Sequence, residues 1–316
     1  MSTEPGPDAS PDPEPSASGS GTVSTASSGV PALRDVVAAA HRLWPVDTQQ
    51  PWDASGLLAG RPEASVRRIL LAVDAVTSTV AEAVEQEADL LLTHHPLLMR
   101  GVTTVAADTY KGRMLHELIE HRIGLLACHT TADAALDGVS DVLGRACGLT
   151  EMRPLVPSSV QPRIGIGRVG QLERPVSLRE LAEALAGAVP PTAQGVRVAG
   201  DPHRLLRRIA VCGGSGDSLL ETVRAQEADV YVTADLRHHP ASEARETALT
   251  GSGAPALIDL SHAASEWLWL PVGARQLQDE LRSQGFEVEI AVSRRRTDPW
   301  DFRVASPHED PQDRWG

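Results

Sequence analysis

The sequence predicts an α/β protein made of two similar α/β lobes that arose by an internal duplication. Short apolar runs alternate with segments of helical periodicity along most of the 316-residue chain, as in mostly parallel sheets covered by helices. The second half also repeats the first at an offset of 140 residues, so that Glu87-Ala88-Asp89-Leu90 aligns with Glu227-Ala228-Asp229-Val230. We place the lobes at residues 30–150 and 162–300, and the last segment of the second lobe is free to pack back on the first.

Both ends of the chain are predicted to lie outside the lobes. Residues 1–29 consist mostly of Pro, Ser, Gly, Thr and Ala, so they bury too little apolar surface to offset the entropy of ordering. They also carry four acidic residues and no basic one: Glu4, Asp8, Asp12 and Glu14. We therefore interpret them as a disordered acidic tail, and residues 301–316 as a second tail.

The first lobe is predicted to open with a helix. Apolar residues recur at helical spacing after Pro31, which suits a first turn, and Pro45 ends the run. They are Leu33, Val36, Val37, Ala40, Leu43 and Trp44. In the loop that follows, we expect Trp52 to be buried. Because a lone aspartate in a turn usually bonds its own backbone, we favour packing and turn formation over a functional role for Asp53.

Strands and helices alternate through the rest of the first lobe. Strands are predicted at 69–74, 90–92 and 123–127, with helices at 78–86 and around 114–119. The second of these helices presents one apolar face, formed by Met114, Leu115, Leu118 and Ile119. The run 90–92 has no alternating polar position, which is typical of a strand buried on both faces of a parallel sheet.

Histidines follow two of these strands at their carboxyl ends, where open α/β sheets place their sites. His94 and His95 come directly after strand 90–92, and His129 follows strand 123–127. Adjacent imidazoles project in different directions, so one backbone corner can offer a nitrogen to each of two metal ions. This pattern indicates a metal site at that edge of the sheet.

The second lobe repeats the arrangement of strand, histidine and carboxylate. His262 follows a strand that resembles the one before His129, and each histidine has a carboxylate four residues later, Asp133 and Glu266. Residues at i and i+4 of a helix share a face, so His262 and Glu266 can reach one ion together. Because Thr130-Thr131-Ala132 is a poorer helix opening, His129 and Asp133 are expected in a loop, with only one of them reaching the metal.

Three further motifs receive a structural interpretation. His238-His239 aligns with the first histidine pair, but the four inserted residues 234–237 should displace it from the equivalent position. Gly213-Gly214-Ser215-Gly216-Asp217 could hold a phosphate on its backbone amides, but it lacks the lysine of a P-loop, so we favour a tight turn. Arg294-Arg295-Arg296 is interpreted as a solvated cluster of charge.

Charge and cysteine content narrow the class of protein. The formal net charge of -13 disfavours nucleic acid or an anionic membrane as the main partner. Three widely spaced cysteines, Cys128, Cys147 and Cys212, predict neither a disulfide framework nor a structural zinc site. No apolar run is long enough to span a bilayer, and the amino terminus does not resemble a signal peptide. We expect a cytoplasmic protein.

These residues resemble those of the Nif-three-like dinuclear metal-centre family, whose members are also labelled GTP cyclohydrolase I type-two homologues. The resemblance runs from about Leu33 to Trp300, and the following residues carry it: Trp52-Asp53, Gly56-Leu57, Gly60, Thr93-His94-His95-Pro96, His129-Thr130, Asp133, Gly165, Gly167-Arg168-Val169-Gly170, His262, Ser265-Glu266 and Thr297-Asp298-Pro299-Trp300. Two positions depart from the family pattern: Ala54 replaces the usual asparagine, and Ser261 replaces a glycine.

The resemblance implies a set of metal ligands and an assembly. Two divalent metal ions are expected in the cleft between the lobes, and the subunits are expected to form a toroidal homohexamer. The ligands implied are His94, His95, Asp133, His262 and Glu266. Glu266 is the candidate bridge between the ions, and His129 is expected to support the ligands or to serve as an occasional extra one.

Two functions are compatible with this set. The first is a metal-dependent hydrolase that activates a bridging water on a phosphoester, cyclic amide or nucleotide-like substrate, because five protein ligands leave open positions on two ions. The alternative is a non-enzymatic, metal-loaded hexameric scaffold or regulator that binds a partner protein. Imidazole and carboxylate ligands without thiolate fit Zn, Mn, Fe, Co or Ni and do not distinguish among them.

Overall fold

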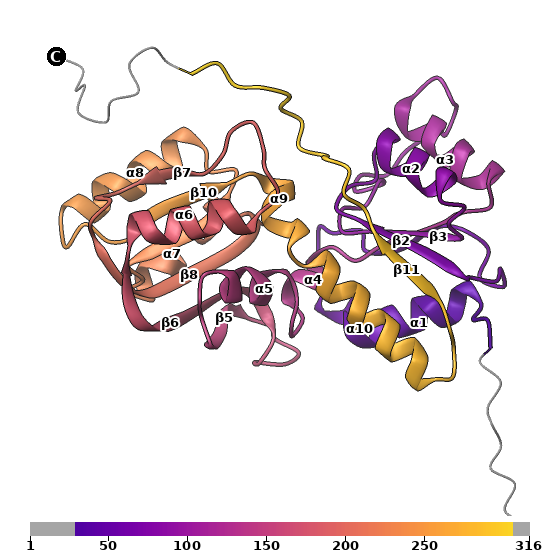
Figure 1. The fold of residues 1–316 in the computed structure, drawn as a ribbon, viewed down its shortest axis with the longest axis horizontal. Coiled ribbons are helices and arrows are strands. Elements are labelled where there is room, and N and C mark those ends of the chain that lie inside the picture. Colours follow the sequence, from indigo (N-terminus) through magenta and orange to yellow (C-terminus); the bar gives the residue numbers. More distant parts are fainter. Residues whose placement is uncertain (1–28, 306–316) are drawn as a thin grey trace, which may run out of the picture.

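The computed structural model describes residues 29–305, so most of the tails predicted at 1–29 and 301–316 lies outside the described residues. Within the described range the chain forms two α/β lobes, each with its own sheet (Figure 1). The predicted fold class is thereby confirmed. None of the helices in this range is both long and apolar enough to cross a membrane.

The first lobe contains a five-stranded sheet in the order β1-β4-β3-β2-β11. All neighbouring strands are parallel except β1, which runs antiparallel to β4. The central strand β3 therefore ends between the carboxyl ends of β2 and β4. The strands are β1 (Gly56–Ala59), β2 (Arg68–Ala72), β3 (Leu90–Thr93), β4 (Gly124–Ala127) and β11 (Glu289–Val292).

Helices cover both faces of this sheet, which explains why the strands are apolar throughout. Leu90 and Leu92 pack towards α1 (Leu33–Leu43) and α10 (Leu270–Ser283). Leu91 points to the opposite face, which is covered by α2 (Thr77–Glu85) and α3 (Tyr110–Glu120). Successive side chains of a strand alternate between faces, so burial on both sides removes the polar positions that an exposed face would show.

Two residues of the first lobe are not buried as predicted. Trp52 is 61% exposed and lies against the His129 ring, with 5.6 Å between ring centroids. Ile119 is 64% exposed, whereas Met114, Leu115 and Leu118 are buried. Ile119 directly follows Leu118, and one residue turns a helix by about 100°, so the apolar face is narrower than predicted.

The second lobe contains a six-stranded sheet in the order β5-β6-β8-β9-β10-β7. Its three central strands, β8, β9 and β10, are parallel, and the other three pair antiparallel with their neighbours. The strands are β5 (Glu151–Pro157), β6 (Gly165–Ser177), β7 (Arg197–Ala199), β8 (Leu205–Ser215), β9 (Val230–Ala234) and β10 (Ala256–Leu260).

Helices also cover both faces of the second sheet. One face carries α5 (Val139–Ala146) and α6 (Leu178–Ala188), and the other carries α7 (Leu220–Ala225) and α8 (His238–Leu249). Two short 3-10 helices, Val46–Thr48 and Asp217–Leu219, complete the connections in the described range. Strand β5 lies in the segment that the sequence left as a connection between lobes. It contains two prolines, which are tolerated because β5 lies at the edge of the sheet.

The duplication is visible in individual hydrogen bonds. Asp89 precedes β3 and accepts bonds from the backbone amides of residues 67 and 68 at 2.7 and 2.9 Å. Asp229 precedes β9 and accepts the same two bonds, both 2.8 Å long, from residues 207 and 208. The equivalent carboxylates thus tie each middle strand to the start of its neighbour.

The end of the chain returns to the first lobe. Helix α10 packs on α1, and β11 adds a parallel edge strand to β2 (Figure 1). Gly29, which was assigned to the tail, donates its amide to the Gly285 carbonyl at 3.0 Å in the turn before β11. As a result the chain crosses between the lobes twice, and the second crossing follows α9 (His262–Trp267).

Candidate metal centre

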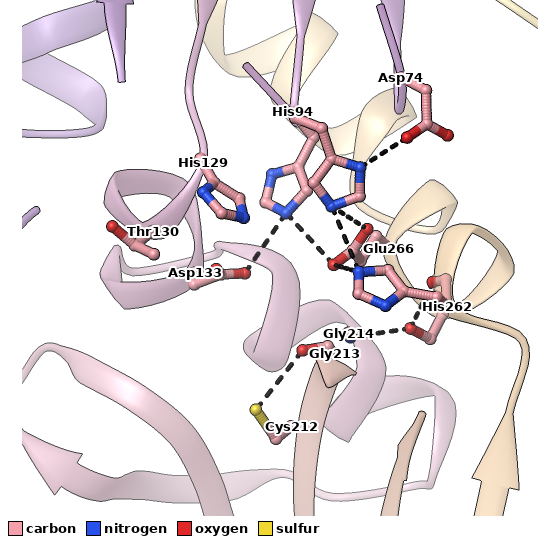
Figure 2. Close-up of polar contacts among 12 residues, drawn as sticks. Asp74, His94, His129, Thr130, Asp133, Cys212, Gly213, Gly214, His262 and Glu266 are labelled. Carbon is pink, nitrogen blue, oxygen red and sulfur yellow. Dashed lines mark hydrogen bonds and ion pairs between the residues drawn. The ribbon is translucent and has the colours of Figure 1, made fainter. Parts of the chain in front are cut away.

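The five predicted ligands come together where the lobes meet (Figure 2). His94 and His95 follow β3, and Asp133 lies in α4 (Thr130–Ala134) after β4. His262 and Glu266 lie on α9, after β10 of the second lobe. The prediction of a loop around Asp133 is wrong, because residues 130–134 form a short helix that His129 caps.

Glu266 is the point on which the other side chains converge. Its Oε1 lies 3.1 Å from His262 Nε2 and 3.4 Å from His94 Nε2, and its Oε2 lies 3.1 Å from His95 Nε2. Asp133 Oδ1 is 3.7 Å from His94 Nε2, and the facing Nε2 atoms of His95 and His262 are 3.3 Å apart. Each contact is shorter than 4 Å, so one or two cations could be shared among these atoms.

The imidazoles are held from behind through their Nδ1 atoms. His94 Nδ1 lies 3.0 Å from the Cys128 carbonyl, and His95 Nδ1 lies 2.7 Å from Asp74. His262 Nδ1 lies 2.7 Å from Asp235. With Nδ1 engaged, the Nε2 atom of each ring is presented to the centre, an arrangement that is typical of metal-binding histidines.

His129 is held in the same way, by Asp53. Its Nδ1 lies 2.8 Å from Asp53 Oδ1, and the second oxygen of that carboxylate accepts bonds from Ser55 and Thr130. Its ring lies 5.2 Å from that of His94, between centroids, and His94, His95 and His129 form one group that could hold an ion. Asp53 does bond its own turn, as predicted, but it also orients a histidine of the site.

Three carboxylates behind the site were missed as functional residues. Asp74 and Asp235 were not singled out, and Asp53 was assigned to a turn. A signal was available for two of them, because Asp74 follows the end of β2 and Asp235 follows the end of β9, at the edges where the ligands lie. Asp235 also belongs to the inserted segment 234–237, which therefore supplies a carboxylate to His262.

Several atoms at the centre have no hydrogen-bond partner among the described residues. They are His94 Nε2, Asp133 Oδ1 and Glu266 Oε2, and all three are buried. An unsatisfied buried polar group costs about 1–3 kcal/mol, and more when it is charged. A divalent cation would satisfy all three, and imidazole nitrogens with carboxylate oxygens are ordinary ligands for one. The residues present therefore fit a metal ion.

The charges of the cluster are strongly coupled. Burial alone would lower the pKa of His95, but Glu266 and Asp74 outweigh it and raise the pKa to about 10. Glu266 likewise raises the pKa of His262 to about 11, against the effect of burial. Burial raises the pKa of the Glu266 carboxyl, yet the three imidazoles hold that pKa well below its usual range. In the absence of a cation, protons on the imidazoles balance the buried carboxylate.

The glycines at the end of β8 make room for Glu266. Gly214 has a positive φ of 68°, and a Cβ atom there would lie 2.3 Å from Glu266 Oε1 and 3.2 Å from His262 Nε2. Its amide donates to Ser265 Oγ at 2.9 Å. The interpretation of this motif as a tight turn is only partly right, because Gly213, Gly214 and Ser215 form the end of β8, where the pairing with β9 shifts register, and the chain leaves the strand at Gly216.

The second histidine pair does not join this cluster. His238 and His239 begin α8, and both side chains are exposed to solvent. Their rings contact each other, with 5.2 Å between centroids. Neither belongs to a group of potential ligands in the described range, consistent with displacement by residues 234–237.

Solved structures of other proteins share this fold. A Bacillus cereus protein related to NIF3 superposes with a TM-score of 0.78 at 21% identity, covering 87% of this chain and 100% of that one. A hypothetical protein of Staphylococcus aureus gives a TM-score of 0.78 at 26% identity, with 86% and 99% covered. The two-lobe arrangement is therefore found in experimental structures as well.

Sequence comparison gives closer relatives. The chain is 50% identical over 279 residues to the GTP cyclohydrolase 1 type 2 homolog of Streptomyces coelicolor, covering 88% of this chain and 96% of that protein. It is 34% identical to the protein of the same name from Mycobacterium tuberculosis, with 85% and 97% covered. The family model described as Duf34/NIF3 (NGG1p interacting factor 3) matches residues 31–299. The chain thus belongs to the Duf34/NIF3 family, as the resemblance of its motifs predicted.

Proposed function

We propose that this protein binds two divalent metal ions and is a metal-dependent hydrolase acting on a phosphoester, cyclic amide or nucleotide-like substrate. The convergence of three imidazole Nε2 atoms around the buried carboxylate of Glu266, with Asp133 beside His94, is the observation that carries this proposal. Several of these atoms lack any other partner, which supports a cation as the missing one.

The ligands divide into two groups on the two sides of Glu266. His94 and Asp133 lie on one side, and His95 and His262 lie on the other. Glu266 Oε1 lies near both His94 and His262, and Oε2 lies near His95, so Glu266 contacts both groups and is the natural bridge. We assign His94 and Asp133 to one ion and His95 and His262 to the second, with Glu266 shared.

Two ions held in this way would polarise a substrate oxygen and lower the pKa of a water molecule. The chain itself supplies orientation and proton transfer. Asp74, Asp235 and Asp53 fix the imidazole rings, and His129 lies beside the ligands with its Nδ1 held by Asp53. His129 is therefore the candidate for accepting a proton during hydrolysis, or for completing the coordination of an ion.

Metal content and turnover test this function directly. Gently purified protein should contain two divalent ions per chain by elemental analysis, and a chelator should remove both hydrolysis and metal together. Suitable probes are p-nitrophenyl phosphate, bis-p-nitrophenyl phosphate and hydantoin as a cyclic amide. Protein that holds two ions but hydrolyses none of a broad set of phosphoesters and amides would favour the alternative, a metal-loaded scaffold.

One feature of the surface favours assembly. A cavity of about 830 Å³ lies between β1 and α3, and its wall includes the exposed side chains of Ile119 and Val105. We propose that such apolar surface is covered in a homohexamer, as the family resemblance implies, and that the protein works in the cytoplasm. Light scattering should then give a mass near six chains, and a monomer at micromolar concentration would rule the hexamer out.

A further inference from the structure

Arg168 is a buried arginine outside the ligand set. It lies on β6 of the second lobe, and its side chain is 1% exposed. The guanidinium forms a two-pronged ion pair with Asp141 of α5, with Nε to Oδ1 at 2.5 Å and Nη2 to Oδ2 at 3.0 Å. A buried ion pair adds little net stability, because desolvation of both charges offsets their attraction. Net stability therefore does not explain why this buried ion pair is present.

The remaining donors of Arg168 bind backbone carbonyls at two places. Nη1 donates to the carbonyls of Gly165 and Gly167 at 2.5 and 2.9 Å. Nη2 donates to the carbonyls of Ala134 and Ala135 at 3.4 and 2.8 Å. The latter two carbonyls end α4, the helix that carries Asp133, so a side chain of the second lobe caps a ligand-bearing helix of the first.

Helix α4 needs such support because it has only five residues. Isolated helices of that length are not stable in water. Its start is fixed by Asp53, which accepts bonds from the Thr130 amide and hydroxyl at 3.1 and 2.5 Å. Its end is fixed by Arg168, which binds the carbonyls of the two residues that follow Asp133. The carboxylate of Asp133 is thereby held between two anchored ends.

We propose that Arg168 is a positioning residue that sets Asp133 against His94 and Glu266 across the boundary between the lobes. This inference rests on the proposed metal site. Lysine could keep the charge opposite Asp141, but it lacks the planar fork that reaches several acceptors at once. The requirement is therefore for arginine and not only for a positive charge.

The test compares Arg168→Lys with Asp133→Asn and the double variant, using titration with Co²⁺ followed by its visible absorption spectrum. Loss of a group that orients a ligand typically costs about 10–100-fold in metal affinity, so Arg168→Lys should weaken one of the two ions by that factor. The other ion should bind as before. Because Arg168 acts through Asp133, Arg168→Lys should have no further effect in the Asp133→Asn background.

Arg145→Lys is the matched control. That arginine also pairs with a single aspartate near α5, Asp137, but both side chains are largely exposed. Arg145→Lys should leave the affinities for both Co²⁺ ions and the visible absorption spectrum unchanged. Arg168→Ala provides a second variant, and guanidinium ion at a low, non-denaturing concentration should restore the lost Co²⁺ site.

Hydrogen exchange of the metal-free protein separates this inference from the proposed function. Arg168→Lys should speed exchange at residues 130–135 selectively, whether or not the wild type binds metal. Wild-type protein that takes up no divalent ion would overturn the hydrolase proposal. Two ions bound to Arg168→Lys with wild-type affinity, equal weakening of both ions, or unchanged exchange at 130–135 would overturn the role of Arg168.

Discussion

At the scale of single residues, Glu266 is the side chain that contacts most of the other candidate ligands. Its side chain is buried and faces three imidazoles, whose Nε2 atoms lie 3.1–3.4 Å from its oxygens. Glu266→Gln keeps the shape but removes the charge that would balance the two proposed divalent cations in a partly desolvated site. We expect affinity for at least one ion to fall steeply, as measured by elemental analysis after dialysis, while the circular dichroism spectrum is unchanged.

His239→Ala serves as the control for that substitution. His239 is exposed on α8, away from the cluster, so this variant should keep both ions. If Glu266→Gln still holds two ions, or His239→Ala loses one, then the metals belong to the other half of the duplication.

Gly214 gives a second test at this scale. Alanine there would combine a positive φ with a Cβ that overlaps Glu266 Oε1. The left-handed conformation alone costs about 1–2 kcal/mol for a residue with a side chain. Gly214→Ala should therefore lower both the midpoint of chemical unfolding and the metal affinity.

Gly187→Ala is the matched control for Gly214. Gly187 lies in α6, where a Cβ would meet nothing within 4 Å. In a helix interior, alanine is more favourable than glycine by about 1 kcal/mol. Gly187→Ala should therefore be at least as stable as the wild type and should bind metal normally. Wild-type metal binding by Gly214→Ala would show that Glu266 can move aside without loss.

The sequence predicted which residues would meet at the site better than it predicted what supports them. The ligands follow strand ends, and strand ends can be read from apolar runs. The support of His95 by Asp74, and of His262 by Asp235, depends on which strands are neighbours in space, and pairing order does not follow from local pattern. Trp52 was placed wrongly for a similar reason, because an aromatic residue in a loop gives no periodicity from which burial could be judged.

At the scale of elements, the strands buried on both faces were the most predictable part. β3 and β9 appear where the repeat placed them, and their equivalence extends to the hydrogen bonds of Asp89 and Asp229. Helix α4 was not predicted, because its threonines and its length disfavour a helix when taken alone. Contacts from Asp53 and Arg168, both distant in sequence, account for it.

The same buried elements shield the cysteines. Cys128, Cys147 and Cys212 are free and buried, and burial raises the pKa of the Cys147 and Cys212 thiols to about 12. Since the thiolate is the reactive form, a thiol reagent at pH 8 should label none of the three in the folded protein. All three should react after unfolding in guanidinium chloride, and rapid labelling of one in the native state would mean that its element opens readily.

At the scale of the whole molecule, the site exists only because the two lobes meet. His94, His95 and Asp133 come from the first lobe, and His262 and Glu266 come from the second. The repeat predicted two lobes and left the last segment free to pack back on the first, but it did not predict that α10 and β11 are the elements that return. That return depends on a parallel pairing between β11 and β2, which are far apart in sequence, and short apolar strands carry little information about their partner.

The charges gathered where the lobes meet predict how stability depends on pH. In the metal-free protein the pKa values of His95 and His262 are raised to about 10 and about 11, against about 6.5 for an unfolded histidine. A group whose pKa is raised by folding stabilises the fold fully below its unfolded pKa, and this contribution is lost as the pH rises through the folded value. The melting temperature of metal-free protein should therefore fall between pH 7 and pH 10.

The metal-loaded protein should not show this fall, because its bound imidazoles carry no proton to lose over the same range. A cation must displace the protons on His95 and His262, so its affinity rises with pH, and the stabilisation that it gives rises with it. Calorimetric scans with and without Zn²⁺ from pH 6 to pH 10 should diverge as the pH increases. In Glu266→Gln the raised pKa values lose their main cause, so the fall in melting temperature of the metal-free protein should become shallow. If the difference in melting temperature with and without Zn²⁺ is the same at every pH, then the metal does not displace protons from these imidazoles.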